Sequence, residues 1–376
     1  MKALLISCYE FHYDLRFKYV ENILKNRGFQ VKKVFSDFNH LNKQRISKEV
    51  PGTIMIKVPA YQKNISIGRL YSHAVFSYRL RAVLKSEKPS LIFADIPPNA
   101  IAVTVASYKR RNEKCKVIFD IFDLWPESFS EFNFLKIHLG FWKRIRTRAL
   151  QKADYITLVC EYYQSFLEKS LRLKQYSMLY LCKPTPIEPL QFSHEGGSLN
   201  FCYLGSINNI IDISAVIKVL NYINHRRRVK LYIVGDGEKR EMFLEQLRQN
   251  EIDVHYVGLT FDEKVKNEIF RQCHFGINMY KEDVVVGLTM KSIDYFRVGL
   301  PTLNMNIHDT GILVEKYQSG YKLSTESLEK TLDAIVGLDE KEWRVLHENT
   351  VRMFNELFSE DVFEEKFGKV LDIVEG

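Results

Sequence analysis

Three carboxylates, a tryptophan and a proline lie together in the stretch DIFDLWPES, which directly follows the apolar run KVIF. Functional side chains commonly follow buried strands, because loops at strand ends present chemistry on a rigid scaffold. The stretch is therefore a candidate catalytic loop. A structural role is the alternative: Asp123 would cap a helix that begins at Pro126, and Trp125 would belong to the core.

Two stretches place glycines where a predicted strand meets a helix. In LYIVGDGEKREMF these are Gly235 and Gly237; in YLGSINNIIDI it is Gly205, and Ser206 follows as a possible donor to phosphate. Glycines there let the backbone approach a ligand phosphate, and the following helix offers unpaired N–H groups. Arg240 replaces the third glycine of a dinucleotide fingerprint, which argues against an NAD site. An ordinary tight turn is the alternative at each position.

The segment VVVGLTMKSIDYFRVGLPTL combines a glycine, a helix start and a charged pair. After Gly287, Thr289 is suited to cap a helix, and Lys291 would lie in its first turn. A lysine there repels the helix dipole, so a bound anion is the simplest reason for its position. Asp294 follows one turn later and could bind a ribose while Lys291 holds the attached diphosphate. A solvated Lys–Asp pair is the alternative.

A basic amphipathic helix is predicted over roughly residues 134–152. One stripe holds His138, Trp142, Ile145 and Ala149, and another face gathers Lys136, Lys143, Arg144, Arg148 and Lys152. This pattern is typical of a helix that lies on an anionic membrane. An ordinary surface helix of a basic domain is the alternative.

Length and composition indicate a folded protein of two domains. The chain has 376 residues, of which 46% are hydrophobic and 27% charged, and this length exceeds one ordinary core. Six scattered cysteines without a CxxC pair indicate the reduced thiols of a cytosolic protein and argue against a zinc site. No apolar run has the length of a membrane span or a signal peptide core, so we expect the protein to stay inside the cell.

The net charge of +8 conceals two unlike halves. Residues 1–190 hold 32 Lys and Arg against 16 Asp and Glu, whereas residues 191–376 hold 22 against 30. A basic first half indicates an anionic partner such as membrane headgroups, nucleic acid or a phosphorylated substrate.

Short apolar runs alternate with helix-like stretches, which predicts parallel sheets with helices on both faces. The strands predicted in this way are residues 2–7, 29–36, 90–95, 116–122, 155–160, 199–205, 229–235, 252–258, 274–280 and 301–306. The alternation breaks at CKPTPIEPLQFSHEGGS, whose prolines and glycine pair indicate a linker, and then resumes. We therefore predict two doubly wound α/β domains, residues 1–188 and 189–354, with a C-terminal helix at about 355–376 that packs back on the first. Ligands of such sheets bind beyond the carboxyl ends of the strands, here in the cleft between the domains.

In order and spacing, FDLWPES, YLGS, LYIVGDGEKREMF, HYVG and MKSIDYFRVGLPTL resemble family 4 glycosyltransferases of the GT-B fold. The most similar members are bacterial enzymes that build capsule, exopolysaccharide or O-antigen, and the resemblance covers most of residues 90–305. It implies two Rossmann-like domains, a nucleotide-sugar donor in the second and an acceptor in the first. It also implies transfer with retention and no metal or other cofactor.

The resemblance also assigns roles to single residues of the DLWPES loop. Asp123 would contact the transferred sugar or the acceptor hydroxyl, with Glu127 as the second choice of carboxylate and Asp120 as the third. Trp125 would lie on the acceptor side. Lys291 and preorganised N–H groups would stabilise the negative charge on the leaving diphosphate, and a carboxylate the positive charge at the anomeric carbon.

On the donor side, Asp294 matches the second acid of the family's motif of two glutamates separated by seven residues. The first acid falls at Val286, and Glu282 or Asp283 could take its place. Asp294 would contact the ribose, and the HYVG stretch would offer backbone groups to the base. The other donor-binding residues are then Gly205, Ser206, Gly235, Gly237, Tyr256, Val257, Gly287, Thr289 and Lys291.

The resemblance and the charge asymmetry together imply a location. The acceptor of such enzymes is usually a polyprenyl-diphosphate-linked saccharide in the inner leaflet, so the basic half would dock there and the protein would be cytoplasmic and peripheral. The membrane-facing residues would be Lys136, Trp142, Lys143, Arg144 and Arg148. UDP is the nucleotide we expect, because it is the commonest in such pathways.

Three other functions stay open. A sugar-nucleotide 2-epimerase of the same fold would turn over its substrate without an acceptor. A nucleic-acid-binding protein could use the basic half, although no recognition motif is present. A catalytically degenerate glycosyltransferase-like subunit would fit Val286 and the absence of an Arg and a Lys that many family members carry after the YLGS turn.

Overall fold

The computed structural model describes residues 1–40, 42–46, 50–63, 66–125, 136–172, 174–186 and 197–376, with the backbone alone for 10–15 and 136–139. The chain forms two units. The N-terminal unit consists of residues 1–180 and 363–376, and the C-terminal unit of residues 181–362.

These divisions lie near, but not at, the sequence-based boundaries of 188 and about 355. The segment after Tyr180 already belongs to the second unit, because the Lys183 amide donates to the Phe358 carbonyl at 3.0 Å and Arg297 donates to the Pro184 carbonyl at 2.8 Å. The proline-rich stretch therefore begins inside the C-terminal unit.

The N-terminal unit contains one parallel sheet with the strand order β3-β2-β1-β4-β5-β6-β7. Its strands are β1 (Lys2–Ile6), β2 (Gln30–Ser36), β3 (Thr53–Ile56), β4 (Leu91–Ile96), β5 (Lys116–Ile121), β6 (Tyr155–Leu158) and β7 (Tyr176–Met178). The central strand β4 is buried along its whole length, which is why LIFADI is an almost continuous apolar run. The strand order reverses between β1 and β4, where ligands of such sheets bind at the carboxyl ends.

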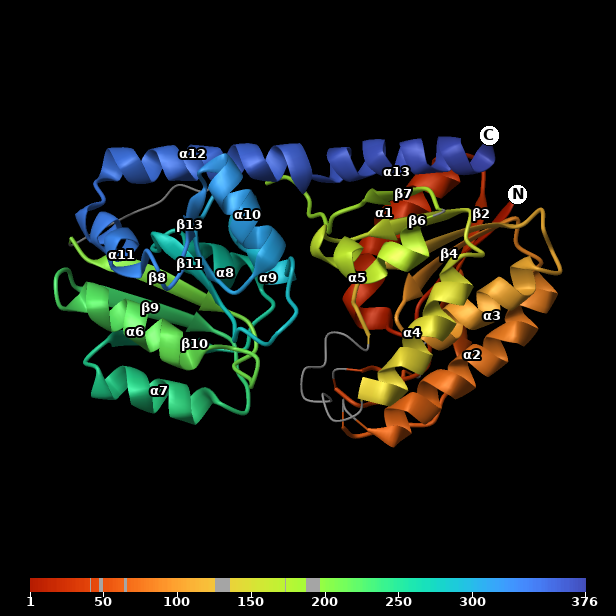
Figure 1. The fold of residues 1–376 in the computed structure, drawn as a ribbon, viewed down its shortest axis with the longest axis horizontal. Coiled ribbons are helices and arrows are strands. Elements are labelled where there is room, and N and C mark those ends of the chain that lie inside the picture. The colour runs from red at the N-terminus through yellow and green to blue at the C-terminus, as the bar shows by residue number, and fades with distance from the viewer. Residues whose placement is uncertain (41, 47–49, 64–65, 126–135, 173, 187–196) are drawn as a thin grey trace. The chain divides into compact units, whose positions relative to one another are not determined.

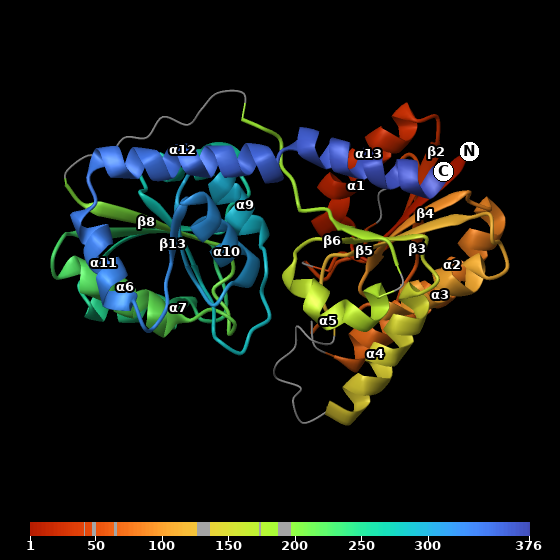
Figure 2. The same ribbon diagram turned by 45° about the horizontal axis from the view of Figure 1, so that its top comes forward.

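Helices cover both faces of this sheet: α1 (Glu10–Asn26), α2 (Ile67–Glu87), α3 (Asn99–Lys109), α4 (Lys136–Leu150), α5 (Tyr162–Leu171) and the greater part of α13 (Glu360–Glu375). Helices α2, α3 and α4 lie side by side as one layer (Figure 1 and Figure 2). On the other face, Phe363 of α13 packs on Tyr19 of α1, and Phe367 packs on Phe93 of β4, with ring centroids 5.8 and 5.5 Å apart.

The C-terminal unit contains a second parallel sheet, in the order β10-β9-β8-β11-β12-β13. Its strands are β8 (Leu199–Leu204), β9 (Val229–Val234), β10 (Asp253–Gly258), β11 (Phe275–Met279), β12 (Thr302–Met305) and β13 (Gly320–Lys322). Its helices are α6 (Ile213–Asn224), α7 (Arg240–Gln249), α8 (Glu263–Phe270), α9 (Met290–Arg297), α10 (His308–Tyr317), α11 (Leu328–Gly337) and α12 (Glu340–Leu357). One helix layer contains α6, α7 and α11, and the other contains α8, α9, α10 and α12 (Figure 1).

The doubly wound α/β fold is confirmed in both units, and the long alternating elements lie where the sequence predicts them. Three strands were not predicted, namely β3, β7 and β13. Each is three or four residues long and lies at or next to the edge of its sheet. Such short strands carry too little hydrophobic periodicity to be recognised.

Candidate functional site

The two glycine turns of the C-terminal unit pack backbone against backbone at the carboxyl ends of β8 and β9. A Cβ on Gly235 would lie 1.9 Å from the Gly205 carbonyl oxygen, and a Cβ on Gly237 would lie 2.3 Å from the Ile207 carbonyl oxygen. Only glycine fits at these two positions. The predicted turns after β8 and β9 therefore pack directly against each other.

Tyr295 fixes helix α9 against the same sheet. Its hydroxyl donates to the Cys202 carbonyl at 3.0 Å and accepts from the Leu204 amide at 2.8 Å. Its ring occupies the space beside Gly276 of β11, where a Cβ would come within 2.6 Å of the ring. Tyr295 is thus a positioning residue that the sequence analysis did not identify.

Lys291 lies in the first turn of α9, which Thr289 caps with its side chain as predicted. The lysine chain runs past Gly205, where a Cβ would lie 3.6 Å from the Lys291 Cδ. Its ammonium lies over the rings of Tyr203 and Tyr280, 4.9 and 4.8 Å from their centroids. Burial lowers the pKa of Lys291 to about 7. The sequence separates Lys291 and Gly205 widely, and the fold brings them together.

This arrangement suits an anion. Among the residues that the structure describes, no carboxylate pairs with Lys291, and the first-turn amides of Met290 and Lys291 have no acceptor. A buried ammonium without a counter-charge is costly, and a helix N-terminus adds a positive dipole. A phosphate placed here would accept hydrogen bonds from the amides and neutralise the lysine. The Ser206 side chain is exposed at the neighbouring turn.

Asp294 interacts with Lys183 and Lys266 and not with Lys291. Its Oδ1 forms an ion pair with Lys183, and its Oδ2 lies 3.7 Å from the Lys266 Nζ. Lys266 also pairs with Glu263 at 2.5 Å. The Asp294 side chain is only 12% exposed. The alternative interpretation, a solvated Lys291–Asp294 pair, is therefore wrong, and a ribose that binds Asp294 must share it with two lysines.

Tyr256 and Val257 lie at the end of β10, at the edge of the C-terminal sheet. The pairing with β9 shifts register between Tyr256 and Gly258, so the strand bulges there. Tyr256 is partly exposed, and the Arg240 guanidinium lies 6.0 Å from the centroid of its ring. Arg240, which stands where a dinucleotide fingerprint has glycine, also pairs with Asp236 at 3.2 Å. Contact of Tyr256 and Val257 with a base stays a prediction.

The loop between β11 and α9 contains the positions that correspond to the first motif acid. Val286 packs against the hydrophobic core of the C-terminal unit. Glu282 and Asp283 are exposed, and neither takes part in an ion pair with the described residues. The Gly287 carbonyl accepts from the Thr310 amide at 3.0 Å, which ties the loop to α10. Replacement of the first acid by Glu282 or Asp283 stays a prediction.

In the N-terminal unit, Asp123 and Trp125 follow β5 directly. The Asp123 carboxylate accepts a hydrogen bond from the Leu124 amide at 2.7 Å. Trp125 packs edge-to-face on Trp142 of α4, with centroids 5.2 Å apart. Glu127 lies outside the described residues. Asp123 and Trp125 thus lie at the carboxyl end of a central strand, as the sequence predicts.

Asp120 does not fit the catalytic role that was its third-choice assignment. It is fully buried, and its two oxygens accept hydrogen bonds from Arg16 at 2.6 and 2.7 Å and from Thr157 at 2.5 Å. Arg16 also donates to the Leu179 carbonyl at 3.0 Å. Next to it in register, Asp95 is buried, and burial and the Asp120 charge raise its pKa well above the usual range. Asp120 is therefore a structural anchor.

A polar cluster that the sequence analysis did not predict lies at the carboxyl ends of β1, β2 and β3. Tyr9 accepts a hydrogen bond from Arg69 of α2 at 2.8 Å, and its hydroxyl lies 3.1 Å from His73 Nε2. Arg69 can only donate, and the tautomer of His73 decides whether its Nε2 donates to the Tyr9 hydroxyl or accepts from it. Burial lowers the pKa of His73 to about 3, so the imidazole is neutral and can accept. His40 Nδ1 and the Tyr61 hydroxyl pair at 2.6 Å beside them.

This cluster interacts electrostatically with the candidate catalytic loop. Burial lowers the Arg69 pKa, but Tyr9 and, to a smaller extent, Asp123 raise it, and the net shift is upward. A cation, two hydroxyls and two imidazoles thus accompany Asp123 at the edge of the sheet where ligands bind. The only sequence signal was local: Tyr9 follows a strand, and Arg69 and His73 lie one turn apart at the start of a helix.

Helix α4 carries the residues expected to face a membrane. Lys143, Arg144 and Arg148 are exposed, and so is Phe141, whose side chain the sequence analysis did not include. Trp142 is only half-exposed and packs on Trp125, and its contact with a membrane stays a prediction. The side chain of Lys136 lies outside the described part of the structure.

Within the described ranges, no three His, Cys, Asp or Glu side chains gather as a metal site would require. None of the helices in the described part of the chain is long and apolar enough to cross a bilayer. The expectation that no metal or other cofactor takes part stays a prediction.

Part of the chain is similar in sequence to known glycosyltransferases. The family model described as "Glycosyl transferases group 1" matches residues 198–340, a segment that contains the Gly205 turn, Gly235 and Lys291. A chitobiosyldiphosphodolichol beta-mannosyltransferase of Eremothecium gossypii is 27% identical over 128 residues, which is 33% of this chain and 26% of that protein. The match spans about a quarter of the length of this curated relative.

Solved structures are similar over the whole chain. Sucrose-phosphate synthase from Thermosynechococcus elongatus has a TM-score of 0.71 at 11% identity, covering 99% of this chain and 98% of that one. HepE from Anabaena in complex with UDP has a TM-score of 0.71 at 13% identity, covering 99% and 100%. The same protein in complex with UDP-glucose has a TM-score of 0.68 at 14% identity, covering 99% of each chain. These findings confirm the two-domain α/β fold class. The family model supports the resemblance to a GT-B glycosyltransferase over residues 198–340, and the capsule, exopolysaccharide or O-antigen subtype stays a prediction.

Proposed function

We propose that this chain, which has the fold and the family-matched segment of a GT-B glycosyltransferase, is a hexosyltransferase that uses a nucleotide-sugar, a UDP-sugar, as donor. The acceptor is a lipid-linked saccharide, and the sugar is transferred with retention during the synthesis of a surface polysaccharide. The observation that carries the proposal is the position of Lys291, which lies at a helix N-terminus and against the Gly205 turn, without a carboxylate partner among the described residues.

The chemistry follows from the charges. When the glycosyl–diphosphate bond breaks, negative charge develops on the diphosphate and positive charge at the anomeric carbon. Lys291 and the first-turn amides of α9 stabilise the negative charge, and Asp123 stabilises the positive one. The acceptor hydroxyl gives its proton to the departing diphosphate oxygen, and the C–O bond to the acceptor forms as the bond to the diphosphate breaks.

The comparisons support the donor and acceptor classes. The Anabaena protein was solved with UDP and with UDP-glucose. The name of the Eremothecium relative contains a lipid diphosphate acceptor and a mannosyl group. We therefore propose a diphosphate-linked lipid acceptor for this chain, and a sugar-nucleotide as its donor. The product anomer, read by NMR, tests retention: an inverted linkage would refute that part.

We further propose that the protein is cytoplasmic and binds the inner face of the membrane as a peripheral protein. The exposed Phe141, Arg144 and Arg148 of α4 and the basic N-terminal half support this step. Binding that does not depend on anionic lipid would contradict it.

A thermal-shift panel of UDP, GDP, dTDP and CMP tests the donor site. A nucleotide that binds the native state raises the melting temperature by mass action. We expect UDP to raise the melting temperature of the wild type and of Lys330→Met, an exposed control on α11, and to raise that of Lys291→Met much less. For each variant, the melting temperature with nucleotide is compared with that of the same variant without nucleotide. A panel in which no nucleotide acts, with or without vesicles, would refute the proposed function.

A degenerate subunit is the second candidate, because Val286 packs against the core and Asp294 is engaged by two lysines. Such a subunit would show neither transfer nor hydrolysis with any nucleotide-sugar. A 2-epimerase would convert the donor without an acceptor, which chromatography of the sugar-nucleotide detects.

A further inference from the structure

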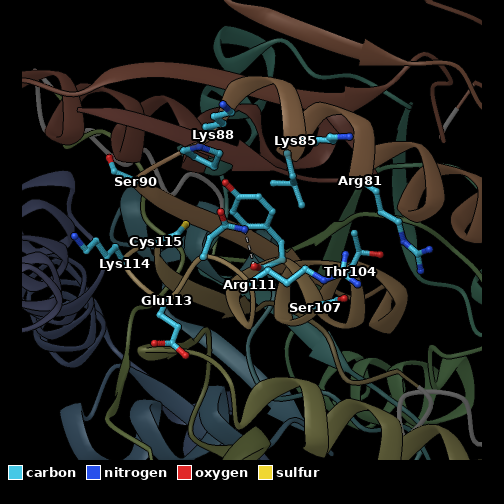
Figure 3. Close-up of a pocket in the computed structure, with 14 residues that line it drawn as sticks. Arg81, Lys85, Lys88, Ser90, Thr104, Ser107, Arg111, Glu113, Lys114 and Cys115 are labelled. Atoms are coloured by element: carbon cyan, nitrogen blue, oxygen red, sulfur yellow. Dashed lines mark hydrogen bonds between the residues drawn. The ribbon is translucent and has the colours of Figure 1, made fainter.

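A large hollow lies on the N-terminal unit at the amino ends of β4 and β5, the opposite edge of the sheet from Asp123 (Figure 3). It has a volume of about 910 Å³ and lies between the last turns of α2 and α3. None of the residues assigned above to the donor or acceptor lines it. We call it the basic hollow.

Five cationic side chains line the basic hollow: Arg81, Lys85, Lys88, Arg111 and Lys114. None of them forms an ion pair with a described carboxylate. The one acidic lining residue, Glu113, points away from Lys85 and Lys88 (Figure 3).

The nearby acids are engaged elsewhere. Glu87 pairs with Lys32 at 2.8 Å, and Asp154 pairs with Lys109 at 3.0 Å. The positive charge of the basic hollow is therefore not neutralised within the described structure.

Helix dipoles account for only part of this charge. A cation in the last turn of a helix is favourable, and Lys85 occupies such a position in α2. However, α3 ends at Lys109 with Arg110 as its C-cap, so Lys114 lies beyond the helix end and adds repulsion that the helix dipole does not offset. Like charges gathered in one concave site are stabilised by an anion that enters it.

An exposed apolar stripe leads to this site along α2. Four large side chains, between 45% and 85% exposed, follow one another on this helix: Ile67, Leu70, Tyr71 and Tyr78. Leu70 and Tyr71 lie three and four residues after Ile67, and Tyr78 lies seven residues after Tyr71, which places all four on one face. The same face continues to the cationic Arg81 and Lys85. Exposed apolar residues next to cations are typical of a surface that contacts anionic lipid.

We propose that the basic hollow binds the phosphate of an anionic phospholipid headgroup, while the α2 stripe inserts between the headgroups. This inference deepens the membrane partner of the proposed function and rests on it. Leu84, Pro89 and Tyr108 give the hollow an apolar wall suited to the glycerol part of a lipid. A soluble phosphate compound shares the headgroup chemistry but lacks the contact with the stripe.

Co-sedimentation of the full chain with vesicles tests the proposal. The vesicles contain phosphatidylcholine alone or with added phosphatidylglycerol. The triple variant Lys85→Gln, Lys88→Gln, Lys114→Gln removes three charges from the hollow. Its matched control removes three exposed lysines of the C-terminal unit: Lys218→Gln, Lys264→Gln and Lys330→Gln.

Each cation near an anionic surface contributes roughly fivefold to binding, so the hollow variant should bind on the order of a hundredfold more weakly to the anionic vesicles. The control should bind like the wild type. The double variant Tyr71→Ser, Tyr78→Ser should also bind more weakly, with its dependence on salt unchanged. Equal loss in the hollow variant and the control would overturn the proposal, because it would show a charge effect without a site.

Two further arms separate the sources of phosphate and the two proposals. Glycerol phosphate at constant ionic strength should not release the protein from vesicles; full release together with a rise in melting temperature would overturn the lipid assignment in favour of a soluble ligand. UDP-induced thermal stabilisation should be the same in the hollow variant and the wild type. If the wild type does not bind anionic vesicles but UDP still stabilises it, the membrane-site proposal is wrong and the proposed function stands. If UDP does not stabilise the wild type, the proposed function itself is wrong.

Discussion

The environment of Lys291 predicts that nucleotide binding takes up a proton. Burial lowers its pKa from 10.5 to about 7, so at pH 8 about 0.9 of the molecules hold a neutral amine. A diphosphate beside the amine favours the ammonium form and raises the pKa again. Binding of UDP, which is itself fully ionised at pH 8, should therefore draw about 0.9 proton from the buffer. Affinity should then fall close to tenfold for each pH unit above 8.

Isothermal titration calorimetry at pH 8 measures this uptake directly. The observed binding enthalpy is compared between two buffers of different ionisation enthalpy, and the slope gives the number of protons. Lys291→Met should bind UDP more weakly and take up no proton, whereas Lys330→Met should behave like the wild type. Uptake near zero in the wild type would refute the assignment of Lys291 to the phosphate, and uptake that persists in Lys291→Met would assign the proton to another group.

The same shift has a consequence for stability without ligand. The folded-state pKa of Lys291 lies below its unfolded value of 10.5, so between pH 7 and 10.5 the unfolded chain binds more protons and stability rises with pH. Between pH 7 and 8.5 the gain should be about 1.5 kcal/mol. Urea unfolding of the wild type and Lys291→Met at both pH values measures this gain. The free energy of unfolding should rise by this amount more in the wild type than in the variant.

Three further substitutions test single features. Asp120→Asn breaks the buried ion pair with Arg16 and should lower the free energy of unfolding by about 3 kcal/mol in urea titrations; a loss below 1 kcal/mol would contradict the anchoring role. Gly235→Ala adds a methyl group 1.9 Å from a backbone oxygen and should abolish UDP binding in calorimetry, whereas Gly337→Ala, with nothing within 4 Å, should not. Tyr9→Phe should lower transfer activity at unchanged UDP affinity, and full activity would separate the polar cluster from the acceptor.

The sequence predicts those parts of this protein that depend on local pattern. Buried parallel strands form apolar runs, so the two sheets and most of their helices were predictable. The Thr289 cap and the glycine turns carry local signals as well. What could not be predicted depends on residues far apart: Lys183 reaches Asp294 across 111 residues, and Arg16 reaches Asp120 across 104. No local pattern reports which carboxylate is engaged in the folded chain.

The polar cluster around Tyr9 shows the same limit in another form. Each of its residues is ordinary where it stands in the sequence, and its chemistry arises only when β1, β2 and α2 meet. The phosphate site was partly predictable, because a lysine in the first turn of a helix is already unusual in the sequence alone.

The N-terminal unit can be completed only after the last residues of the chain, 363–376, have been synthesised. Residues 1–180 emerge first, but the face of their sheet that carries Phe93 is covered by Phe367, which is made only after the whole C-terminal unit. Helix α1 also packs on this face through Phe17, so until then only the part that α13 covers stays open during synthesis, when a nascent chain is most prone to aggregate. Chaperones that hold exposed apolar surface should therefore bind nascent chains stalled before residue 363 more strongly than chains that extend past it.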